Sequence, residues 1–527
     1  MLFIEVMEMI NAIPQEAIEK YLKQTRWFGG KGREFLKTEF EIIIPCITND
    51  NKENIWLTIL NINYQQGDSE KYFLPIASTS QIIPANYSKI YCHDQDCFYD
   101  ALFSENFRKF IFDALKNNMN SLNGISAVSQ QHYFKNAEYK SSVIFNAEQS
   151  NSSFLVNESF FFKVFRKISK EENTDFEILK YLSIETEFRK IPVYYGSLEI
   201  SSEKTYDTGI DSFLKKDSYL VAMALEKIDN SGSAWDIFYH SAKNFLGLLL
   251  NENLNSLSTP EVHEIVEKIL SNSFGIDFFN KIEKLANATS QMHLALLSNP
   301  KNAIEFKKEL LEDNRKLLEQ DLEKLISNRI ESLNKLEDKL TQTDLIYFKR
   351  LEENKDKIIS MMHTVIRNAY NVSCIRIHGD YHLGQALWTG NDFVILDFEG
   401  EPDKPHVYRR SKFPCLKDVA GVIRSFHYAI YAALFDMEKE SPGIKDVLEP
   451  FAKKWFEIIS EVFLKNYYAE VKGTDLIGNE IQTKQLFEFF LFEKAIYELG
   501  YEINNRPEWI AIPLKGINYL LETQFND

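Results

Sequence analysis

The stretch from 375 to 402, IRIHGDYHLGQALWTGNDFVILDFEGEP, contains side chains whose types and spacing suggest chemistry. Asp380 lies in a polar loop, Gln385 follows five residues later, and Asp397 comes after a second apolar run with Glu399 close behind. Phosphoryl transfer needs one carboxylate to orient and deprotonate an acceptor hydroxyl, and further oxygens to hold magnesium against the phosphates. We therefore expect Asp380 to act on the hydroxyl and the other three side chains to bind Mg2+.

The elements around these residues must bring the acidic positions together. The pattern predicts a strand at 375–377, a loop at 378–385, a short strand, a Thr-Gly-Asn-Asp turn at 389–392 and a strand at 393–396. Such a hairpin places the loop and the residue after the last strand at the same end. A lone aspartate is usually a surface or capping carboxylate. The prediction of a catalytic site therefore depends on the combined spacing of all four side chains.

A nucleotide-binding region is expected upstream, between 141 and 228, where three short strands are followed by a helix at 172–183 and a strand at 218–228. Lys163, in FFFKVFR, is a cation between apolar strand positions. Pairing with Glu177 on the helix and contact with phosphates would explain it. A strand lysine on its own is more often an edge residue that blocks aggregation.

Two further segments complete the predicted nucleotide site. The loop EQSNSS, 148–153, offers hydroxyls at Ser150 and Ser152 and backbone N–H groups to phosphates. Residues Glu226 to Ile228 are expected to form the hinge that meets adenine. The glycine-rich GGKGR, 29–33, lacks the spacing of a P-loop.

Composition limits the classes of function. The 527 residues are 44% hydrophobic and 26% charged, with a net charge of −17, which fits a globular chain and disfavours binding to nucleic acid or anionic lipid. Five cysteines without a CxxC pair argue against a disulfide framework and a zinc module. No run approaches the ~20 apolar residues of a membrane span. The beginning of the chain lacks the charged head of a signal peptide, so we expect a cytoplasmic location.

Element patterns predict an α+β chain with three regions. Residues 1–125 mix short strands with one helix, residues 126–228 are rich in strands, and residues 229–527 are mostly helical. Within the last region, 300–345 is rich in Lys, Glu and Leu. We interpret it as an amphipathic helix that covers its own core, with a coiled coil to a partner as the alternative.

The combination of HGDYHLGQ with DFEGEP resembles the maltokinase family, relatives of aminoglycoside phosphotransferases with a protein-kinase-like bilobal fold. Three more segments resemble that family: RWFGGKGR (26–33) its N-terminal cap, KDVAGVIRSFHYA (417–429) the helix after the magnesium aspartate, and EKAIYELGYEINNRPEWIAIPL (493–514) its C-terminal signature. The resemblance implies an N-terminal cap at 1–125, a nucleotide-binding lobe at 126–228 and a helical lobe with the catalytic loop and sugar site.

The activity that the resemblance implies is ATP-dependent phosphorylation of maltose at its anomeric hydroxyl, giving maltose 1-phosphate for α-glucan synthesis. A trehalose synthase in trans is the protein partner that it suggests. By similarity Asp380 is catalytic, Gln385 and Asp397 bind Mg2+ and Lys163 contacts ATP. The sugar-side residues are His382, Arg424, Lys494, Tyr497 and Tyr501. On a helix the last three share one face, although such a stripe can also simply cover a core.

Some positions depart from the family pattern, and they affect the sugar side more than the phosphate side. His427 replaces an acid found in many members, Gly500 replaces a larger and often basic residue, and the 300–345 segment is long. The reaction type is therefore better supported than the acceptor. The alternatives are a glucosamine kinase, an aminoglycoside kinase of the same fold, and an inactive binding subunit of a glucan-synthesis complex.

Overall fold

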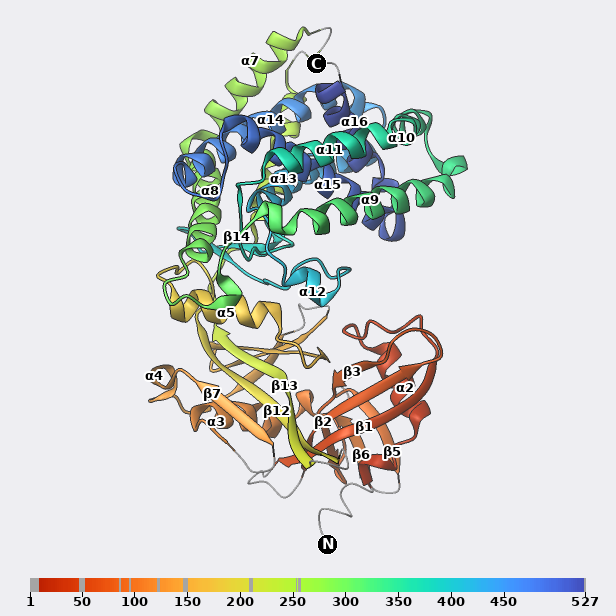
Figure 1. Ribbon diagram of the computed structural model, residues 1–527, viewed down its shortest axis with the longest axis vertical. Helices are drawn as coiled ribbons and strands as arrows, with labels where there is room; N and C mark the ends of the chain where they lie inside the picture. The colour runs from red at the N-terminus through yellow and green to blue at the C-terminus, as the bar shows by residue number, and fades with distance from the viewer. Residues whose placement is uncertain are drawn as a thin grey trace. The chain divides into compact units, whose positions relative to one another are not determined.

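The computed structural model describes residues 9–46, 53–84, 87–93, 96–120, 124–145, 150–207, 212–252, 254 and 257–525. It divides into two compact units. Unit 1 comprises Met1–Glu177 and Pro192–Lys227, and unit 2 comprises Ile178–Ile191 and Ile228–Asp527. Strands gather in unit 1 and helices in unit 2 (Figure 1). The predicted α+β class, with a sheet-rich part and a helical part, is confirmed.

The first sheet of unit 1 has seven strands in the order β11-β3-β2-β4-β6-β5, with β1 also paired to β2. Its strands are β1 (Phe35–Cys46), β2 (Asn54–Tyr64), β3 (Glu70–Phe73), β4 (Ile76–Thr79), β5 (Lys89–His93), β6 (Asp96–Asp100) and β11 (Lys167–Ile168). Aromatic and β-branched residues dominate β2, whose central side chains are buried. This sheet and helix α2 (Gln15–Gln24) enclose one hydrophobic core.

The second sheet is antiparallel, with six strands in the order β7-β12-β13-β10-β9-β8. Its strands are β7 (Ile125–Ser129), β8 (Ser142–Phe145), β9 (Ser152–Val156), β10 (Phe160–Val164), β12 (Tyr194–Asp207) and β13 (Ser212–Glu226). The central β10 carries Lys163 opposite Met223 of β13 and Ser153 of β9. The helical elements around the two sheets are η1 (Ala101–Phe103), α3 (Glu105–Lys116), α4 (Gln131–Phe134) and α5 (Thr174–Glu185), whose second half belongs to unit 2.

Unit 2 is built around α13 (Leu416–Glu440), which is buried along almost its whole length. A helix that is buried on all sides forms the core of a large helical unit. The longer helices around it are α6 (Ala234–Leu249), α7 (Thr259–Ile269), α8 (Gly275–Ser298), α9 (Leu311–Asn334), α10 (Gln342–Glu353), α11 (Lys355–Asn368), α14 (Ile444–Val471), α15 (Glu480–Asn505) and α16 (Ala511–Phe525). α14 and α15 both pack on α13.

Unit 2 also contains short elements, which are η2 (Leu270–Phe274), η3 (Ile304–Phe306), β14 (Glu309–Leu310), η4 (Glu337–Lys339), β15 (Ser373–Cys374), η5 (Leu383–Gln385), β16 (Ala386–Trp388), β17 (Phe393–Ile395), α12 (His406–Arg409) and η6 (Pro507–Trp509). Of these, η5 and the hairpin β16–β17 adjoin the candidate site. β16 and β17 form the predicted antiparallel hairpin. Its turn is closed by Thr389, whose N–H donates to the carbonyl of Asp392 at 3.0 Å.

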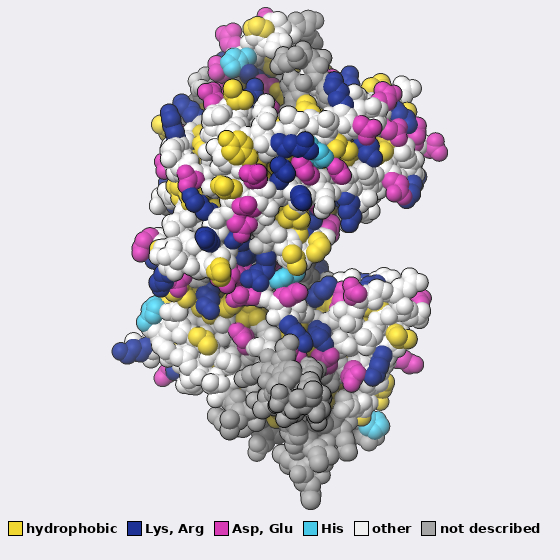
Figure 2. Space-filling model, in the orientation of Figure 1, with side chains coloured by type: hydrophobic (Ala, Val, Ile, Leu, Met, Phe, Trp, Pro, Cys, Tyr) yellow, Lys and Arg dark blue, Asp and Glu magenta, His cyan; other side chains and the backbone are white. Residues whose placement is uncertain are grey.

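The 300–345 segment contains α9, whose apolar face is buried at Leu318, Leu322 and Leu325. The helix packs against α11 and α15. The amphipathic pattern is thus used within the chain's own core. The polar face of α9 is exposed, and Figure 2 shows acidic and basic side chains interspersed over the visible surface.

The cysteines differ from the prediction. Cys92 on β5 and Cys97 on β6 form a disulfide, whereas Cys46, Cys374 and Cys415 are free and buried. The two bonded residues are direct partners in the antiparallel register, which brings their side chains together. An odd cysteine count cannot reveal a pairing that a hairpin creates. Among the described residues, no helix combines the length and apolarity needed to cross a membrane.

Candidate active site

The loop that carries Asp380 is hydrogen-bonded to the carboxylate of Asp418, near the start of α13. Asp418 is 2% exposed. Its Oδ2 accepts a hydrogen bond from the backbone N–H of His378 at 2.8 Å, and its Oδ1 accepts one from Gly379 at 2.9 Å. Gly379 has a φ of 86°, which favours glycine, so the loop turns sharply just before Asp380.

Asp418 is itself held by a buried histidine. His293 Nε2 lies 3.1 Å from Asp418 Oδ2, and His293 Nδ1 lies 2.9 Å from the hydroxyl of Tyr467. Burial acts to raise the pKa of Asp418, but the hydrogen bond and charge of His293 and the backbone N–H of Gly379 prevail and lower it. The carboxylate is therefore ionised, as its role as a multiple acceptor requires.

The ring of His378 ties the loop to the segment that precedes Asp397. Its Nε2 donates to the carbonyl of Leu396 at 2.8 Å, because a carbonyl can only accept, and its Nδ1 faces the N–H of Asp380 at 3.4 Å. The ring also packs against Phe398 with centroids 4.8 Å apart. The loop that carries Asp380 and the segment after the hairpin are thus fixed relative to each other.

Asp380 faces a cation from α15. Lys494 Nζ donates to Asp380 Oδ1 at 3.1 Å and to Glu401 Oε1 at 3.3 Å. Burial alone would raise the pKa of Asp380, but the charge of Lys494, and that of the His382 ring where acid protonates it, lower it below its usual range. Burial likewise opposes the charge of Lys494, whose pKa is nevertheless raised by Asp380 and Glu401. The aspartate is ionised and oriented, which are the properties of a base for a hydroxyl proton.

His382 lies in the same loop and is half-buried. Its Nδ1 accepts a hydrogen bond from Gly384 N at 3.0 Å and so caps the short helix η5. Burial lowers the pKa of His382, while the charge of Asp380 acts to raise it, Lys494 to lower it and Asp397 to raise it. The ring is therefore neutral near pH 7, and it senses both predicted functional carboxylates.

Three oxygen-bearing side chains gather beside the hairpin. Gln385 Nε2 donates to Asp397 Oδ2 at 3.2 Å, and Asp397 and Glu399 each present a carboxylate oxygen within 4.8 Å of the other. The carbonyl oxygen of Gln385 makes no hydrogen bond among the described residues. Asp397 also has a φ of 65°, a costly conformation for a non-glycine residue that is typical of functional sites. Hard oxygen donors in this arrangement fit Mg2+.

The predicted sugar-side stripe lies on one face of α15. Lys494 lies over the ring of Tyr497, 4.6 Å from its centroid, while Tyr501 is 47% exposed one turn further along. Arg424 of α13 is buried and pairs with Glu498 of α15 at 2.7 Å. One face of α15 therefore carries Lys494, Tyr497 and Tyr501. Arg424 contacts the same helix by pairing with Glu498.

A buried network of charges underlies Glu401. Lys417 of α13 donates to both oxygens of Glu493 at 2.5 and 2.7 Å, and Lys404 donates to both oxygens of Asp321 on α9 at 2.6 Å. Glu401 is 3% exposed, and its Oε2 has no hydrogen-bond partner among the described residues. A buried carboxylate oxygen without a donor is costly and points to a polar group supplied from outside.

In unit 1, Lys163 is 6% exposed, and its Nζ lies 2.8 Å from Asp175 Oδ2 at the start of α5. The expected partner, Glu177, lies two residues further along the same helix and is also buried. The contact with Asp175 was not predicted, because residue spacing alone does not show which side of the helix faces the strand.

The remaining predicted nucleotide residues are placed as follows. Ser150 accepts from Asn151 Nδ2 at 3.3 Å, and Ser152 begins β9 and accepts from Arg166 Nε at 2.8 Å. Glu148 and Gln149 of the predicted phosphate loop lie outside the described residues. Glu226 ends β13 and pairs with Val193, and the division between the two units falls directly before Ile228.

The functional candidates that sequence reasoning missed are Asp418, His293, Glu401 and Asp175. Asp418 and Glu401 both lie in segments that resemble family signatures, KDVAGVIRSFHYA and DFEGEP. An acid inside an otherwise apolar helix was the available signal for Asp418. His293 is 85 residues before the loop, and nothing in its local sequence indicates the contact.

Comparison with known proteins gives distant relatives. No family model matches the chain. A glucosamine kinase from Streptacidiphilus jiangxiensis is 23% identical over 153 residues, which is 29% of this chain and 33% of the relative. A glucosamine kinase from Mycolicibacterium smegmatis is 26% identical over 146 residues, 28% of this chain and 34% of the relative. The matched segments thus span about one third of these relatives' length.

Solved structures are similar over nearly the whole chain. A glucosamine kinase in complex with glucosamine, ADP and inorganic phosphate has a TM-score of 0.61, with 13% identity over 97% of this chain and 100% of that one. A second crystal form of glucosamine kinase also gives 0.61, with 14% identity over 96% and 99%. At this identity the similarity establishes the fold. The chain has a protein-kinase-like fold, in the form found in glucosamine kinases.

Proposed function

We propose that this protein is an ATP-dependent kinase that phosphorylates a sugar hydroxyl. The observation that carries the proposal is the ionised Asp380, fixed by Asp418 and faced by Lys494, in a loop that His378 bonds to the segment leading into the oxygen cluster of Gln385, Asp397 and Glu399. This is the division of labour that phosphoryl transfer requires: one carboxylate for the hydroxyl, and separate oxygens for a cation.

In the proposed mechanism, Asp380 accepts a hydrogen bond from the acceptor hydroxyl and takes its proton as the bond to phosphorus forms. Lys494 keeps the pKa of Asp380 low, which holds the carboxylate ionised and oriented. Asp397, Gln385 and Glu399 would hold Mg2+, which supplies charge neutralisation to phosphate oxygens when bound.

Unit 1 is proposed to bind ATP. Lys163 would contact phosphates, with Asp175 and Glu177 as the acids that position it, and residues 226–228 would meet adenine. Ser150 and Ser152 stay proposed phosphate-loop residues, although the hydroxyl of Ser152 is engaged by Arg166. The N-terminal sheet, within 1–125, is proposed to be the cap, 126–228 the nucleotide-binding lobe and 229–527 the catalytic and sugar-binding lobe.

The finer proposal is that the acceptor is maltose, phosphorylated at its anomeric hydroxyl for α-glucan synthesis. It is supported by the motif resemblance and by the stripe of Lys494, Tyr497 and Tyr501, whose rings can stack on a disaccharide. A cytoplasmic location and association with a trehalose synthase are parts of this proposal that the resemblance alone supports.

Glucosamine is the second candidate acceptor. Two relatives with detectable sequence similarity are glucosamine kinases, and so are two solved structures with a similar fold. Two acids, Glu401 and Glu498, lie near Lys494, and such carboxylates attract an ammonium like that of glucosamine. Both candidates share the reaction type and differ only in the acceptor.

The test is incubation of the purified full chain with ATP, Mg2+ and separate acceptors: maltose, glucose, glucosamine and kanamycin. ADP release and phosphorus NMR of the product are measured. Formation of maltose 1-phosphate supports the finer proposal. Turnover of glucosamine but not maltose selects the second candidate, and absence of any sugar phosphate contradicts the kinase proposal.

A further inference from the structure

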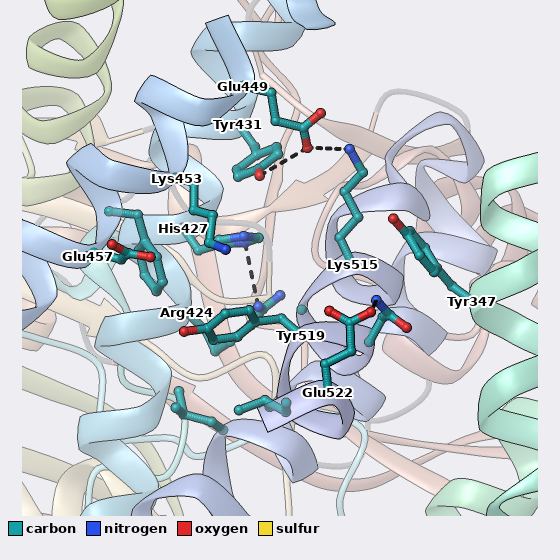
Figure 3. A pocket seen from close by; sticks show the side chains of 15 residues that line it. Tyr347, Arg424, His427, Tyr431, Glu449, Lys453, Glu457, Lys515, Tyr519 and Glu522 are labelled. Carbon is teal, nitrogen blue, oxygen red and sulfur yellow. Dashed lines mark hydrogen bonds and ion pairs between the residues drawn. The ribbon is translucent and has the colours of Figure 1, made fainter. Parts of the chain in front are cut away.

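Unit 2 contains a cavity of about 230 Å³ whose lining residues do not include Asp380 or the oxygen cluster (Figure 3). Its walls come from α10, α13, α14, α15 and α16. Lining side chains include three bases, Arg424, Lys453 and Lys515, and three acids, Glu449, Glu457 and Glu522. The cavity therefore combines apolar surface with charged groups of both signs in equal number, unlike a purely apolar packing defect.

The centre of the cavity wall is His427 of α13. The ring packs against Tyr431 in a tilted arrangement and against Phe456 edge to face, at centroid distances of 4.4 and 5.0 Å. Among the described residues, its hydrogen-bonding contact is Arg424 Nη1, 3.5 Å from Nδ1. Burial and the charges of Arg424 and Lys515 lower the pKa of His427 well below its usual value, so the ring is neutral. With Nδ1 facing a donor, Nε2 carries the proton and is a spare donor.

The other polar groups supply both donors and acceptors. Glu449 accepts from Tyr431 at 3.3 Å and from Lys515, and Glu522 accepts from Arg350 at 2.7 Å. Each carboxylate keeps lone pairs beyond these bonds. Lys453 lies over the ring of Tyr519, 4.9 Å from its centroid, with its ammonium at the exposed rim.

Aromatic rings form the rest of the wall, from Tyr347, Tyr431, Phe456 and Tyr519. Figure 3 shows Tyr347 and Tyr519 on the side of α10 and α16, and His427 and Tyr431 on the side of α13. A sugar ring offers apolar C–H faces to aromatic rings and hydroxyls that both donate and accept. A charged ligand would instead meet charges of its own sign among the three bases or the three acids.

The cavity is connected to the catalytic loop by one helix. Arg424 donates from Nε and Nη2 to Glu498 Oε2 at 2.9 and 2.7 Å. Glu498 follows Lys494 by four residues on α15, about 6 Å along the helix axis, and Lys494 contacts Asp380. The wall of the cavity is thus bonded to the helix turn that faces the catalytic aspartate.

We propose that this cavity binds a neutral sugar ring other than the one that is phosphorylated. The ring is either the distal unit of an oligosaccharide acceptor or a free sugar. The identification of the ligand as a sugar rests in part on the proposed kinase function, whereas the cavity and its charged and apolar lining do not.

Binding is measured on the full chain without ATP, by ligand-detected NMR and calorimetry, with glucose, maltose, glucosamine and glucose 6-phosphate. The variants are His427→Phe, which keeps a ring and removes the donor, and Lys453→Met at the rim. Lys465→Met, exposed on the same helix as Lys453, is the matched control. Loss of one hydrogen bond to the ligand corresponds to about tenfold in affinity.

The expected result is that neutral sugars bind about tenfold more weakly to His427→Phe, and more weakly to Lys453→Met, but normally to Lys465→Met. Equal binding to all proteins overturns the proposal. Tighter binding of glucosamine or glucose 6-phosphate than of neutral sugars overturns the ligand class. Because Lys453 is exposed, its variant keeps the test valid if His427→Phe does not fold.

Kinetics distinguish the two sources of the ring. A distal acceptor unit predicts that His427→Phe raises KM for maltose while KM for a monosaccharide is unchanged. A free sugar predicts weaker binding with both KM values unchanged. If no sugar is phosphorylated by the wild type, the kinase proposal fails while the binding result still decides the cavity.

Discussion

Asp380 is useful as a base only because its neighbours oppose the effect of burial. Burial raises the pKa of a carboxyl group, and here the charge of Lys494, joined by that of His382 once its ring is protonated in acid, reverses that direction. Neither Asp380 nor His382 therefore changes its protonation state near neutral pH. Asp380 is already ionised, and burial keeps the His382 ring neutral. The relevant protonation states are therefore constant over the neutral range.

Replacing Lys494 by Met removes the main charge that lowers the pKa of Asp380, while burial remains. We expect the acid limb of the kcat profile to move upward by about one to two pH units. Activity, which needs the ionised form, is then lost at a higher pH than in the wild type. The measurement is kcat against pH, with Lys484→Met, exposed on the same helix, as control. An acid limb that stays in place would contradict the assignment.

Asp418→Asn keeps the shape of a side chain that accepts two backbone hydrogen bonds and replaces one oxygen by a donor. Because an N–H would then face a donor, we expect a loss of about 1–3 kcal/mol in the free energy of unfolding. We also expect a lower kcat, since the loop of Asp380 loses its anchor. Urea unfolding and steady-state kinetics check both, with exposed Asp446→Asn as control.

The pH dependence of stability follows from the same group. The native pKa of Asp418 is lowered, so its contribution is present above the unfolded value of about 3.9 and is lost as pH falls through the native value. The destabilisation caused by Asp418→Asn should therefore shrink at low pH. A difference between the two proteins that grows in acid would refute this account.

At the residue scale, spacing predicted Gln385 beside Asp397 because the two are close in sequence and joined by a hairpin, whose turn has clear signals. It could not predict Asp418 or His293, since these contacts depend on how α13 and α8 pack. The contact of Lys163 with Asp175 was missed for the same reason, whereas its pairing with Glu177 stays a prediction.

At the element scale, a side chain of α9 packs closely against α15 at a glycine of α15, Gly500. A Cβ at position 500 would overlap the guanidinium of Arg329. Arg329 Nε has no hydrogen-bond partner among the described residues, and burial lowers the pKa of this side chain, while Asp403 and Tyr497 act to raise it. The 300–345 segment therefore does more than cover a core, because it places a cation beside Tyr497.

Gly500→Ala should test this contact against helix propensity. In a helix, alanine is favoured over glycine by about 1 kcal/mol, as we expect for Gly247→Ala on α6, where nothing lies near the added methyl group. At Gly500 the methyl group must displace Arg329, which we expect to cancel that gain. In the background Arg329→Ala, the gain should return. Thermal unfolding of the four proteins forms a double-mutant cycle, and additive effects would contradict the contact.

Element positions were largely predictable, because apolar runs and turns mark them. β2 and the helices of the C-terminal part follow their patterns, and α9 is amphipathic as expected. The two residues of β11 could not be predicted, since so short a strand has no periodicity. The place of Arg329 over Gly500 needs the packing of two helices and is likewise absent from local sequence.

At the scale of the whole molecule, the two sheets of unit 1 are joined by a buried cation. Arg166 follows β10, pairs with Asp100 of β6 at 2.7 Å and lies 4.7 Å from the centroid of the Trp27 ring. Tyr21 of α2 donates to the same Asp100 at 2.7 Å. β11 then pairs with β3 of the first sheet. The region resembling a family cap is thus tied to the strands that carry Lys163.

Asp100→Ala leaves the guanidinium of Arg166 buried without its carboxylate. We expect a loss of about 3–5 kcal/mol in the free energy of unfolding, because an unpaired buried charge is costly. Tyr21→Phe, the matched control, removes one hydrogen bond to the same carboxylate and should cost about 1 kcal/mol. Denaturant unfolding measures both. Similar small losses would mean that the ion pair does not join the sheets.

The most direct test of the central claim compares the wild type with Asp380→Asn. Both proteins receive ATP, Mg2+ and the acceptor that the wild type uses, and sugar phosphate is followed by phosphorus NMR while ADP binding is measured separately. We predict that kcat falls by about 10³-fold with nucleotide binding retained, because the carboxylate acts on the hydroxyl proton. Wild-type turnover in Asp380→Asn would contradict the account.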